Sequence, residues 1–384
     1  MDNDRKRIEV VQQAIKEKCS SGNIQSLLGK GYYVDLSDVE GVAEFMDGLY
    51  PVWRDPCVTG DEIAAIPVTV RNWKTFTRNG VIWEEEDLGP VPTTYDELFD
   101  AIRDWDARGI LDMGYPLFWK GYDSFEVLAY RIINDYVGLR IREGTPIVFE
   151  NETLLRPLRG LEELRRILNA HDAKKPLGDP LLPEGFLNSV VHVGDGDPRL
   201  NYAESVMPLG LTDAQEPVET AFFTVMIINP NSSRVELAKK YLSYLAQHPS
   251  AWAQCMLMQG MPEGVREPGY EDATEKYEQL MSELPERLEA ALREFDDVAG
   301  QQMEERIRAL TYDYLYQWSV RPETAELLYQ ALPYLTVATS DGYGFLQKNG
   351  KEFIDMFVSE QIDSLTLVQR LDERMQMMQS EGIE

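Results

Sequence analysis

The segment Thr220–Ala246 constrains the fold of this chain more than any other, because it joins a buried strand to an amphipathic helix through a short turn. Its apolar run Phe222–Ile228 is too short to span a membrane and is rich in β-branched and aromatic residues, which favours a buried strand. The turn Asn229–Asn231 ends that strand. Ser233 and Glu236 have the spacing of a helix capping box. The side chains predicted to face the core from the following helix are Leu237, Tyr241, Leu242 and Leu245.

Length and charge narrow the classes of function. The 384 residues are enough for one large domain or two of ordinary size, and an apolar content of 43% supplies real cores, so we favour two lobes. A formal charge of −29 argues against nucleic acid and anionic membrane surfaces as partners, because both would repel the chain. Cys19, Cys57 and Cys255 are widely spaced and form no CxxC pair, so neither a disulfide framework nor a zinc site is predicted.

Strands and helices alternate along the chain, which predicts α/β layers. A hairpin at Val58–Ile63 leads into a strand over Ile63–Val70. Thr94 and Glu97 form a second capping box, and the helix that they start should end near Gly109.

Later segments extend this pattern. Ile110–Trp119 reads as a strand, and the stretch 262–310 is acidic and helical, which predicts a solvated helical segment or, as an alternative, a docking face for a basic partner. Pro322 is placed to begin a helix, and Tyr334–Val337 reads as a strand of the second lobe.

Four sets of motifs follow one another in a distinctive order. They are Lys30–Ser37 with Leu49–Pro51 and Ala65–Val68, then Gly89–Leu98, then the strand, turn and helix of Thr220–Ala246, and last a terminal helix in Phe353–Asp363 that runs on to Met378. This order resembles that of the family 1 extracellular solute-binding proteins, which are substrate-capturing subunits of ABC importers and include the maltose-binding type. The resemblance covers roughly Gly31 to Glu384.

The resemblance implies an α/β, two-lobed, periplasmic-binding-protein-like fold of type II with hinge crossings and an added helical segment. It assigns residues 1–112 and 230–330 to an N-terminal lobe, which includes the acidic segment 262–310, and residues 113–229 and 331–384 to a C-terminal lobe. The chain would cross between the lobes first within Ile110–Trp119 and again at Met226–Asn229.

The N-terminus departs from the family pattern. Met1–Arg7 is charged and lacks the apolar region of a signal peptide, and Lys16–Lys18 before Cys19 is unlike a lipobox. Family members usually start with an exported leader and a strand-helix-strand unit, and this chain is expected to enter partway through that unit, at a helix over Ile8–Lys18. The chain is therefore interpreted either as a fragment or start-site error, or as a shortened relative. A missing first strand would leave a sheet position unpaired. The family nevertheless implies an extracytoplasmic location.

Seven residues are candidate ligand contacts. A sugar presents an apolar face of C–H groups and a ring of hydroxyls, so aromatic platforms with polar neighbours suit it. Such side chains are expected where the chain crosses between lobes or at the carboxyl ends of strands. Core packing is the competing explanation for each aromatic residue. The candidates are Trp53, Trp73, Trp119, Tyr122 and Tyr202, with Arg71 and Asp123 as polar partners on adjacency alone.

Motifs for catalysis and for metal binding do not emerge from the sequence. None of His171, His192 and His248 lies beside a nucleophile elbow or a cysteine signature, and Gly194–Pro198 lacks the spacing of an EF-hand. Neither a Walker A loop nor a dinucleotide fingerprint is present. We therefore predict no enzyme, no cofactor and no metal. A carbohydrate-active hydrolase stays open as an alternative, because paired carboxylates are a spatial feature.

We therefore hypothesise that the chain is a binding protein, and two alternative functions stay open. As the resemblance implies, the chain would close by a hinge on a carbohydrate or similar polar solute, act as a monomer, and present the solute to ABC permease subunits. The alternatives are the hydrolase and an acidic scaffold that has lost ligand binding. The identity of the solute is not predicted.

Overall fold

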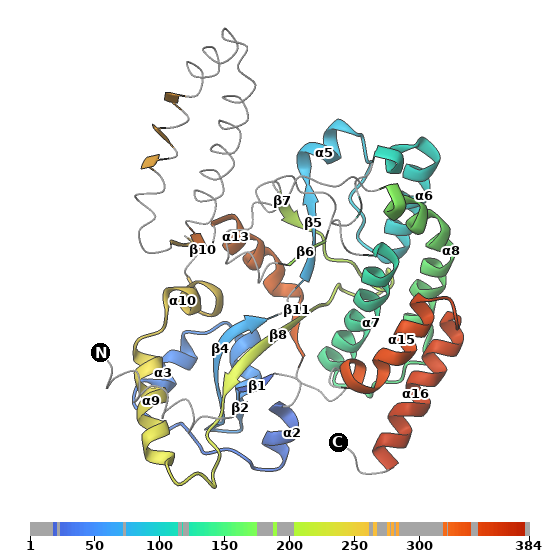
Figure 1. Ribbon diagram of the computed structural model, residues 1–384. Helices are drawn as coiled ribbons and strands as arrows, with labels where there is room; N and C mark the ends of the chain where they lie inside the picture. Colours follow the sequence, from blue (N-terminus) through green and yellow to red (C-terminus); the bar gives the residue numbers. More distant parts are fainter. Residues whose placement is uncertain are drawn as a thin grey trace, which may run out of the picture.

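The computed structural model describes residues 18–20, 24–71, 74–113, 117, 123–174, 187–189, 203–260, 264–266, 275–276, 278–279, 282–283, 318–320, 322–338 and 345–380. Two groups of helices and strands lie side by side, and strand β8 (Glu219–Met226) runs from one group toward the other (Figure 1). Each group has its own hydrophobic core. We call the core around Phe223 the first core and the core around Phe125 the second core.

Strand β8 organises the sheet of the first core. Its side chains are buried except for the partly exposed Phe222 and Met226, which fits the buried strand predicted from the apolar run. Strand β4 (Ile66–Arg71) pairs antiparallel with the carboxyl-terminal part of β8, and β1 (Lys18–Ser20) pairs antiparallel with its last residues. Strand β11 (Leu335–Val337) pairs parallel with the beginning of β8. Successive partners thus cover β8 from its first residue to its last.

Strand β1 differs from the sequence prediction at its first residue. The sequence predicts a helix that runs to Lys18, but Lys18–Ser20 is extended and pairs with Thr224–Met226 of β8. The predicted end of the helix is therefore wrong, because pairing with β8 satisfies the backbone groups of these residues. The absence of a first strand ahead of this helix stays a prediction. The rest of the predicted helix lies outside the described residues.

Several helices surround the first core. They are α2 (Ile24–Gly29), α3 (Val42–Asp47), α4 (Pro51–Arg54), α9 (Val235–Gln247), α10 (Ala251–Leu257) and α13 (Pro322–Ala331). The predicted hairpin is confirmed as β2 (Val58–Thr59) and β3 (Glu62–Ile63), which follow the 3-10 turn η2 (Asp55–Cys57). The predicted helix start at Pro322 is confirmed, and η6 (Leu332–Tyr334) leads into β11 at the predicted strand.

Helix α9 differs from its prediction in its cap and its buried face. It begins at Val235 after Arg234, and no side chain caps it, so the predicted Ser233–Glu236 capping box is wrong. Leu237 is 40% exposed, whereas Leu242 is buried between two alanines. Small side chains let α9 approach α3 closely, and this packing turns Leu237 outward. The buried side chains are Ala238, Leu242 and Ala246.

The second core combines a small sheet with long helices. Strand β5 (Lys74–Asn79) pairs antiparallel with β6 (Leu187–Ser189) and with β7 (Ala203–Val206). The helical elements are α5 (Gly80–Glu85), α6 (Tyr95–Arg108), η3 (Ile110–Met113), α7 (Ser124–Glu143), α8 (Glu152–Lys174), a π-helical turn η7 (Leu346–Gly350), α15 (Lys351–Val358) and α16 (Ser364–Ser380). Figure 1 shows α6, α7, α8, α15 and α16 gathered on one side of β5.

Local signals set the ends of the long helices in the second core. The capping box of α6 is confirmed, because the Thr94 hydroxyl accepts a hydrogen bond from the Glu97 amide, and Gly109 ends the helix with a φ of 76°. Helix α7 begins after Asp123, whose side chain accepts from the Glu126 amide. The strand predicted over Ile110–Trp119 is wrong in its first four residues, which form η3.

The chain passes between the two cores at three places among the described residues. Val70 belongs to the first core and Phe76 to the second, so the β4–β5 connection is one passage. The beginning of β8 is another, between Val218 and Ala221. The third directly follows β11, because Val337 lies in the first core and Ala338 in the second.

These passages differ in place from the two crossings expected from the sequence. Ile110, Leu111 and Leu117 pack in the second core, and Ile227 and Ile228 pack in the first. The predicted lobe ranges, 1–112 with 230–330 and 113–229 with 331–384, rest on those crossings. We propose that the lobes follow the cores instead, with the first boundary between residues 70 and 76.

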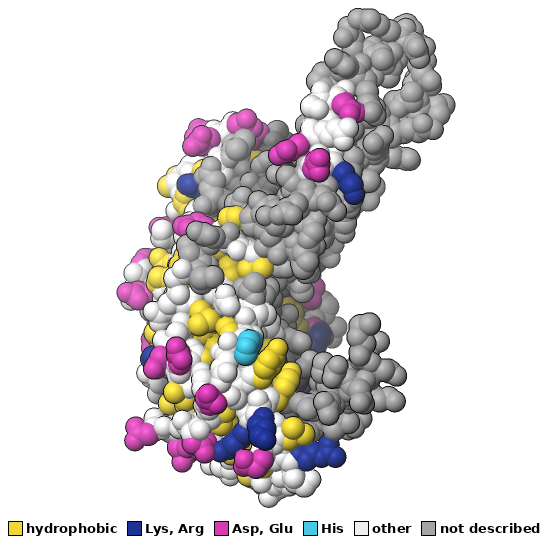
Figure 2. Space-filling view, turned by 90° about the vertical axis from the view of Figure 1, so that its left-hand side faces the viewer, with side chains coloured by type: hydrophobic (Ala, Val, Ile, Leu, Met, Phe, Trp, Pro, Cys, Tyr) yellow, Lys and Arg dark blue, Asp and Glu magenta, His cyan; other side chains and the backbone are white. Residues whose placement is uncertain are grey.

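The acidic balance of the composition is visible on the surface. Figure 2 shows acidic side chains along the face that it draws, in keeping with the formal charge of −29. Most of the predicted acidic helical segment 262–310 lies outside the described residues; strand β9 (Val265–Arg266) pairs with β10 (Trp318–Val320). Across the part of the chain that the structure describes, we find no helix with the length and apolar character needed to cross a membrane.

We expect Gly160→Ala to destabilise the protein, because α8 and α6 are in contact at this glycine. A Cβ atom at Gly160 would lie 2.8 Å from Cδ2 of the buried Phe99 ring. Overpacking of this kind outweighs the gain in helix propensity and should lower the free energy of unfolding by about 1–2 kcal/mol. Urea denaturation measures the change. Gly29→Ala in α2, where no atom lies within 4 Å of the added carbon, is the matched control and should not lower stability.

Candidate functional site

Most of the predicted ligand contacts fall in segments that the structure does not describe. Trp73, Trp119, Tyr122 and Tyr202 lie outside the described residues. Trp73 directly precedes β5 in the chain and therefore belongs to the passage between the two cores. Their role as ligand contacts stays a prediction.

The other three predicted residues have defined positions. Trp53 in α4 is fully buried in the first core, with its ring 6.2 Å from the Phe223 ring, so its contacts are those of core packing. Arg71 is the last residue of β4 and lies opposite Phe222 of β8, at the end of the first core's sheet. Asp123 is exposed at the N-terminus of α7 and caps that helix. These three residues do not form one cluster in the contacts that the structure shows.

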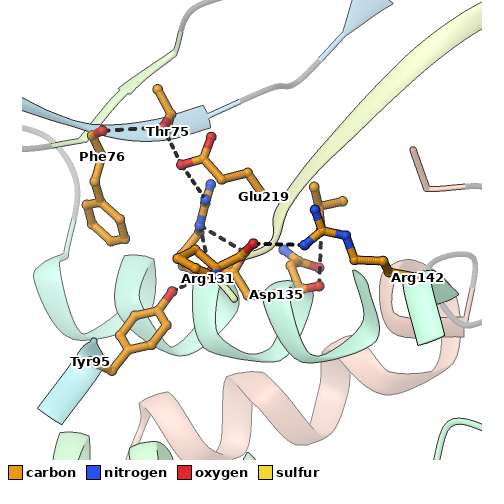
Figure 3. Close-up of polar contacts among 10 residues, drawn as sticks. Thr75, Phe76, Tyr95, Arg131, Asp135, Arg142 and Glu219 are labelled. Carbon is orange, nitrogen blue, oxygen red and sulfur yellow. Dashed lines mark hydrogen bonds and ion pairs between the residues drawn. The ribbon is translucent and has the colours of Figure 1, made fainter. Parts of the chain in front are cut away.

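A different group of residues comes together where the chain passes between the cores. Helix α7 runs through the second core, and Arg131 and Asp135 lie one turn apart on its buried side. Thr75 comes from β5, Glu219 is the first residue of β8, and Tyr95 is the first residue of α6. Figure 3 shows these five side chains converging around the guanidinium of Arg131. We call them the Arg131 cluster.

The Arg131 cluster is held by ion pairs and hydrogen bonds. Arg131 Nε lies 3.0 Å from Oδ2 of Asp135, and Arg131 Nη2 lies 3.1 Å from Oε1 of Glu219. The Tyr95 hydroxyl donates to Asp135 at 2.5 Å, and the Thr75 hydroxyl donates to Glu219. The Phe76 ring lies beside the guanidinium, 5.5 Å from its carbon. One guanidinium thus connects the α7 carboxylate to a carboxylate on β8.

Helix α7 holds the other passages as well. The Thr220 hydroxyl of β8 donates to the Asn134 carbonyl of α7 at 3.1 Å. Near the end of the helix, Arg142 donates to the carbonyl of Pro217, just before β8, and to the carbonyl of Pro333, just before β11, at 3.0 and 2.7 Å (Figure 3). Two passages between the cores, at β5 and at the beginning of β8, are therefore tied to α7, directly or through Glu219, and the same helix holds the segment before β11.

Burial changes the acid–base behaviour of the Arg131 cluster. Arg131, Asp135 and Glu219 are 7%, 1% and 0% exposed. Burial raises the pKa of Asp135 to about 7, with a further rise from Glu219, and these effects outweigh the opposing attraction of Arg131. Burial alone would lower the pKa of Arg131, but Asp135 and Glu219 raise it above its ordinary value, so the guanidinium stays charged. Burial also raises the pKa of Tyr95 well above its ordinary value.

The sequence carried a weak signal for this cluster. Arg131 and Asp135 are four residues apart in the largely apolar run from Phe125 to Leu139. That spacing is most often an exposed ion pair on a helix surface, so it does not by itself indicate a buried site. Glu219 opens the strongly apolar strand β8, and only the fold shows that its carboxylate reaches Arg131.

The arrangement can position strands, and it lacks the features of a metal centre. Within the described ranges, no three His, Cys, Asp or Glu residues are grouped so that they could hold a metal ion. The Arg131 cluster is filled by its own side chains, so its chemistry is that of a buried, proton-sensitive tie between elements.

Comparisons with known proteins show which fold the chain shares with solved structures. No protein-family model matches the chain, and no curated protein matches it either. Solved structures do match: the maltose-bound MalE3 of T. maritima is 14% identical with a TM-score of 0.55, covering 97% of this chain and 88% of that one.

Two further structures match over similar lengths. The galacto-N-biose-/lacto-N-biose I-binding protein of an ABC transporter from Bifidobacterium longum, in complex with lacto-N-biose, is 9% identical with a TM-score of 0.56, covering 98% of this chain and 86% of that one. A sugar transporter from Bacillus licheniformis in complex with stachyose is 12% identical with a TM-score of 0.53, covering 96% and 88%. These likenesses confirm the predicted two-lobed α/β fold of the periplasmic solute-binding proteins.

We expect Arg131→Met to lower the free energy of unfolding by about 3–5 kcal/mol, because two buried carboxylates would lose their positive partner. Arg103→Met is the matched control. Arg103 is a partly exposed arginine of the same core that pairs with Asp100 and Glu163, and its loss should cost less than about 1 kcal/mol. Urea denaturation compares the two variants. Equal losses would contradict a special role of the buried pair.

We expect the stability of the wild type relative to Asp135→Asn to fall as the pH rises. The folded pKa of Asp135, about 7, lies above the ordinary value of 3.8, so between these values the folded state holds a proton that the unfolded state has lost. The stabilisation is complete below the ordinary pKa and is lost as the pH rises through the folded one. The difference in unfolding free energy should change by at most about 1.4 kcal/mol per pH unit.

Urea denaturation of both proteins across this pH range makes the measurement. The exposed Asp100→Asn is the control, because it removes the same charge from the same core without touching the Arg131 cluster. A flat difference between the wild type and Asp135→Asn would contradict the raised pKa.

Proposed function

We propose that this chain is the substrate-binding component of an ABC importer, which captures a carbohydrate or a similar polar solute between its two lobes. The observation that carries the proposal is the likeness of fold along nearly the whole chain to proteins whose structures hold maltose, lacto-N-biose and stachyose. Their low sequence identities make the solute class a proposal and leave the individual sugar to be found by experiment.

The three passages between the cores support a mechanism of binding by closure. A solute that touches both lobes makes more contacts when they are closed, so it favours the closed state by that difference in binding free energy. Short segments that join two separately packed bodies are suited to act as a hinge. The β4–β5 connection, the beginning of β8 and the residues after β11 are such segments.

We infer that the solute is bound near these passages. Trp73 lies within the β4–β5 connection, and Trp119 and Tyr122 precede α7, the helix that holds the passages. Together with Tyr202 they stay our candidates for aromatic contacts, with Arg71 and Asp123 as polar candidates at the ends of β4 and before α7. Trp53 is a weaker candidate, since its side chain is fully buried in the first core.

The proposed function implies particular partners and a particular location. A substrate-binding component delivers its solute to ABC permease subunits, works outside the cytoplasm, and needs neither catalysis nor a cofactor. We propose that the chain acts as a monomer. The formal charge of −29 supports the absence of nucleic acid as a partner, because phosphate would be repelled.

We expect a sugar to raise the melting temperature of the purified protein. A ligand that binds only the folded state stabilises it by about 2.7 kcal/mol when its concentration is about 100 times Kd. Differential scanning fluorimetry against maltose, stachyose, lacto-N-biose and other oligosaccharides, with amino acids and short peptides alongside, identifies the class. Trp73→Ala or Trp119→Ala should abolish the shift without unfolding the protein.

Tyr244→Ala is the matched control for these variants, because Tyr244 is an aromatic side chain on α9 that is 60% exposed. It should leave the shift unchanged. A well-folded protein that no sugar stabilises would contradict the proposal and favour the acidic scaffold. Release of smaller sugars from an oligosaccharide would point instead to the hydrolase.

A further inference from the structure

We propose that Arg131 fastens both β5 and β8 to helix α7 where these strands enter the second core, and that proton exchange at Asp135 sets how tightly it does so. The inference rests on the proposed function for its biological meaning, since it makes the stiffness of the hinge depend on pH. The contacts that carry it belong to the described chain alone.

The place of the Arg131 cluster in the chain is the first step. Thr75 and Glu219 lie on the two strands that adjoin passages between the cores, and each is at or next to the residue where its strand begins. Val70 and Ala221, at the other ends of these two passages, pack in the first core. A side chain that holds Thr75 and Glu219 therefore acts at the hinge and not in the interior of one lobe.

The contacts form a chain that ends on α7. Thr75 donates to Glu219, Glu219 pairs with Arg131 at 3.1 Å, and Arg131 pairs with Asp135 at 3.0 Å. Arg131 and Asp135 lie on the same helix, so α7 supplies both the guanidinium and a carboxylate that competes with Glu219 for it. The guanidinium can direct separate N–H groups to the two carboxylates because its donors are arranged in a fixed fork.

The charges of the Arg131 cluster do not balance when both carboxylates are ionised. Among the described residues, the titratable groups that face Asp135 are Arg131 on α7, Glu219 on β8 and Tyr95 on α6; Thr75 on β5 is polar and does not titrate. Two buried carboxylates then share one guanidinium and repel each other. A proton on Asp135 removes this repulsion and leaves Arg131 and Glu219 as a compensated pair, which strengthens the tie from α7 to β8.

Local opening of the passages should therefore become rarer as Asp135 takes up its proton. Opening lets water reach the carboxyl group, where its pKa returns toward the ordinary value, so the proton favours the closed arrangement. With the pKa of Asp135 at about 7 in the closed arrangement, opening should be suppressed about tenfold between roughly pH 8 and pH 6.

Hydrogen–deuterium exchange of the wild-type protein, corrected for the intrinsic pH dependence of exchange, measures this opening without any ligand. Peptides that cover residues 74–78 and 219–222 should exchange about tenfold more slowly at the lower pH. A peptide from the middle of α8 reports global unfolding, so it should exchange more slowly than the passages at both pH values, which separates local opening from global unfolding. Exchange at the passages as slow as in α8, or no pH effect at the passages, would overturn the proposal.

Two variants sharpen the test. Asp135→Asn keeps the shape and removes the titration, so the exchange of residues 219–222 should lose its pH dependence, while Asp100→Asn should retain it. Arg131→Lys keeps the charge but not the fork, so it should speed exchange at residues 74–78 and 219–222 at both pH values. Retained pH dependence in a folded Asp135→Asn protein would overturn the proposal. These results do not depend on whether any sugar binds.

Discussion

Strand β8 has to satisfy two packing environments within eight residues, and the arrangement of the molecule depends on this. Its carboxyl-terminal part is paired with β4 and β1 and contributes Phe223 and Val225 to the first core. Its beginning is paired with β11 and places Glu219 beside α7. Because the backbone groups of a buried strand must all find partners, β8 cannot shift relative to either core without losing hydrogen bonds. The strand thus couples the two cores.

Helix α7 meets this strand with charged groups where apolar packing would have been possible. Burying Arg131, Asp135 and Glu219 costs desolvation free energy that their mutual attraction has to offset. Aliphatic side chains would supply comparable burial, but their contacts have no direction. The guanidinium selects particular partners on particular strands, and Arg142 does the same for two backbone carbonyls near the end of the helix. The result is a defined register of α7 with β8 and with the segment that precedes β11.

The sequence predicted features that depend on local signals and missed those that depend on packing. The β8 strand, the α6 cap at Thr94 and the helix start at Pro322 were predicted from residues within a few positions of one another. On α9, Leu237 was wrongly predicted to face the core, since the orientation of the helix is set by neighbouring elements, whereas Leu242 is buried and Tyr241 and Leu245 pack against the first core as predicted. The Arg131 cluster joins residues from two helices and two strands far apart in the chain, so periodicity could not reveal it. The aromatic candidates for ligand binding were reached through family resemblance and adjacency, and they remain predictions for the same reason.

The two ends of each passage are held by different kinds of interaction, which bears on where a hinge would bend. On the side of the first core, β4 and β8 are joined by a ladder of backbone hydrogen bonds, whose strength does not depend on the protonation of side chains. On the side of the second core, β5 and β8 are held by Thr75, Glu219 and Arg131, whose interactions change with charge. A relative motion of the lobes would strain the side-chain contacts before it opened the cooperative ladder. The protonation state of Asp135 therefore acts at the second-core end of the passage, where the contacts break first.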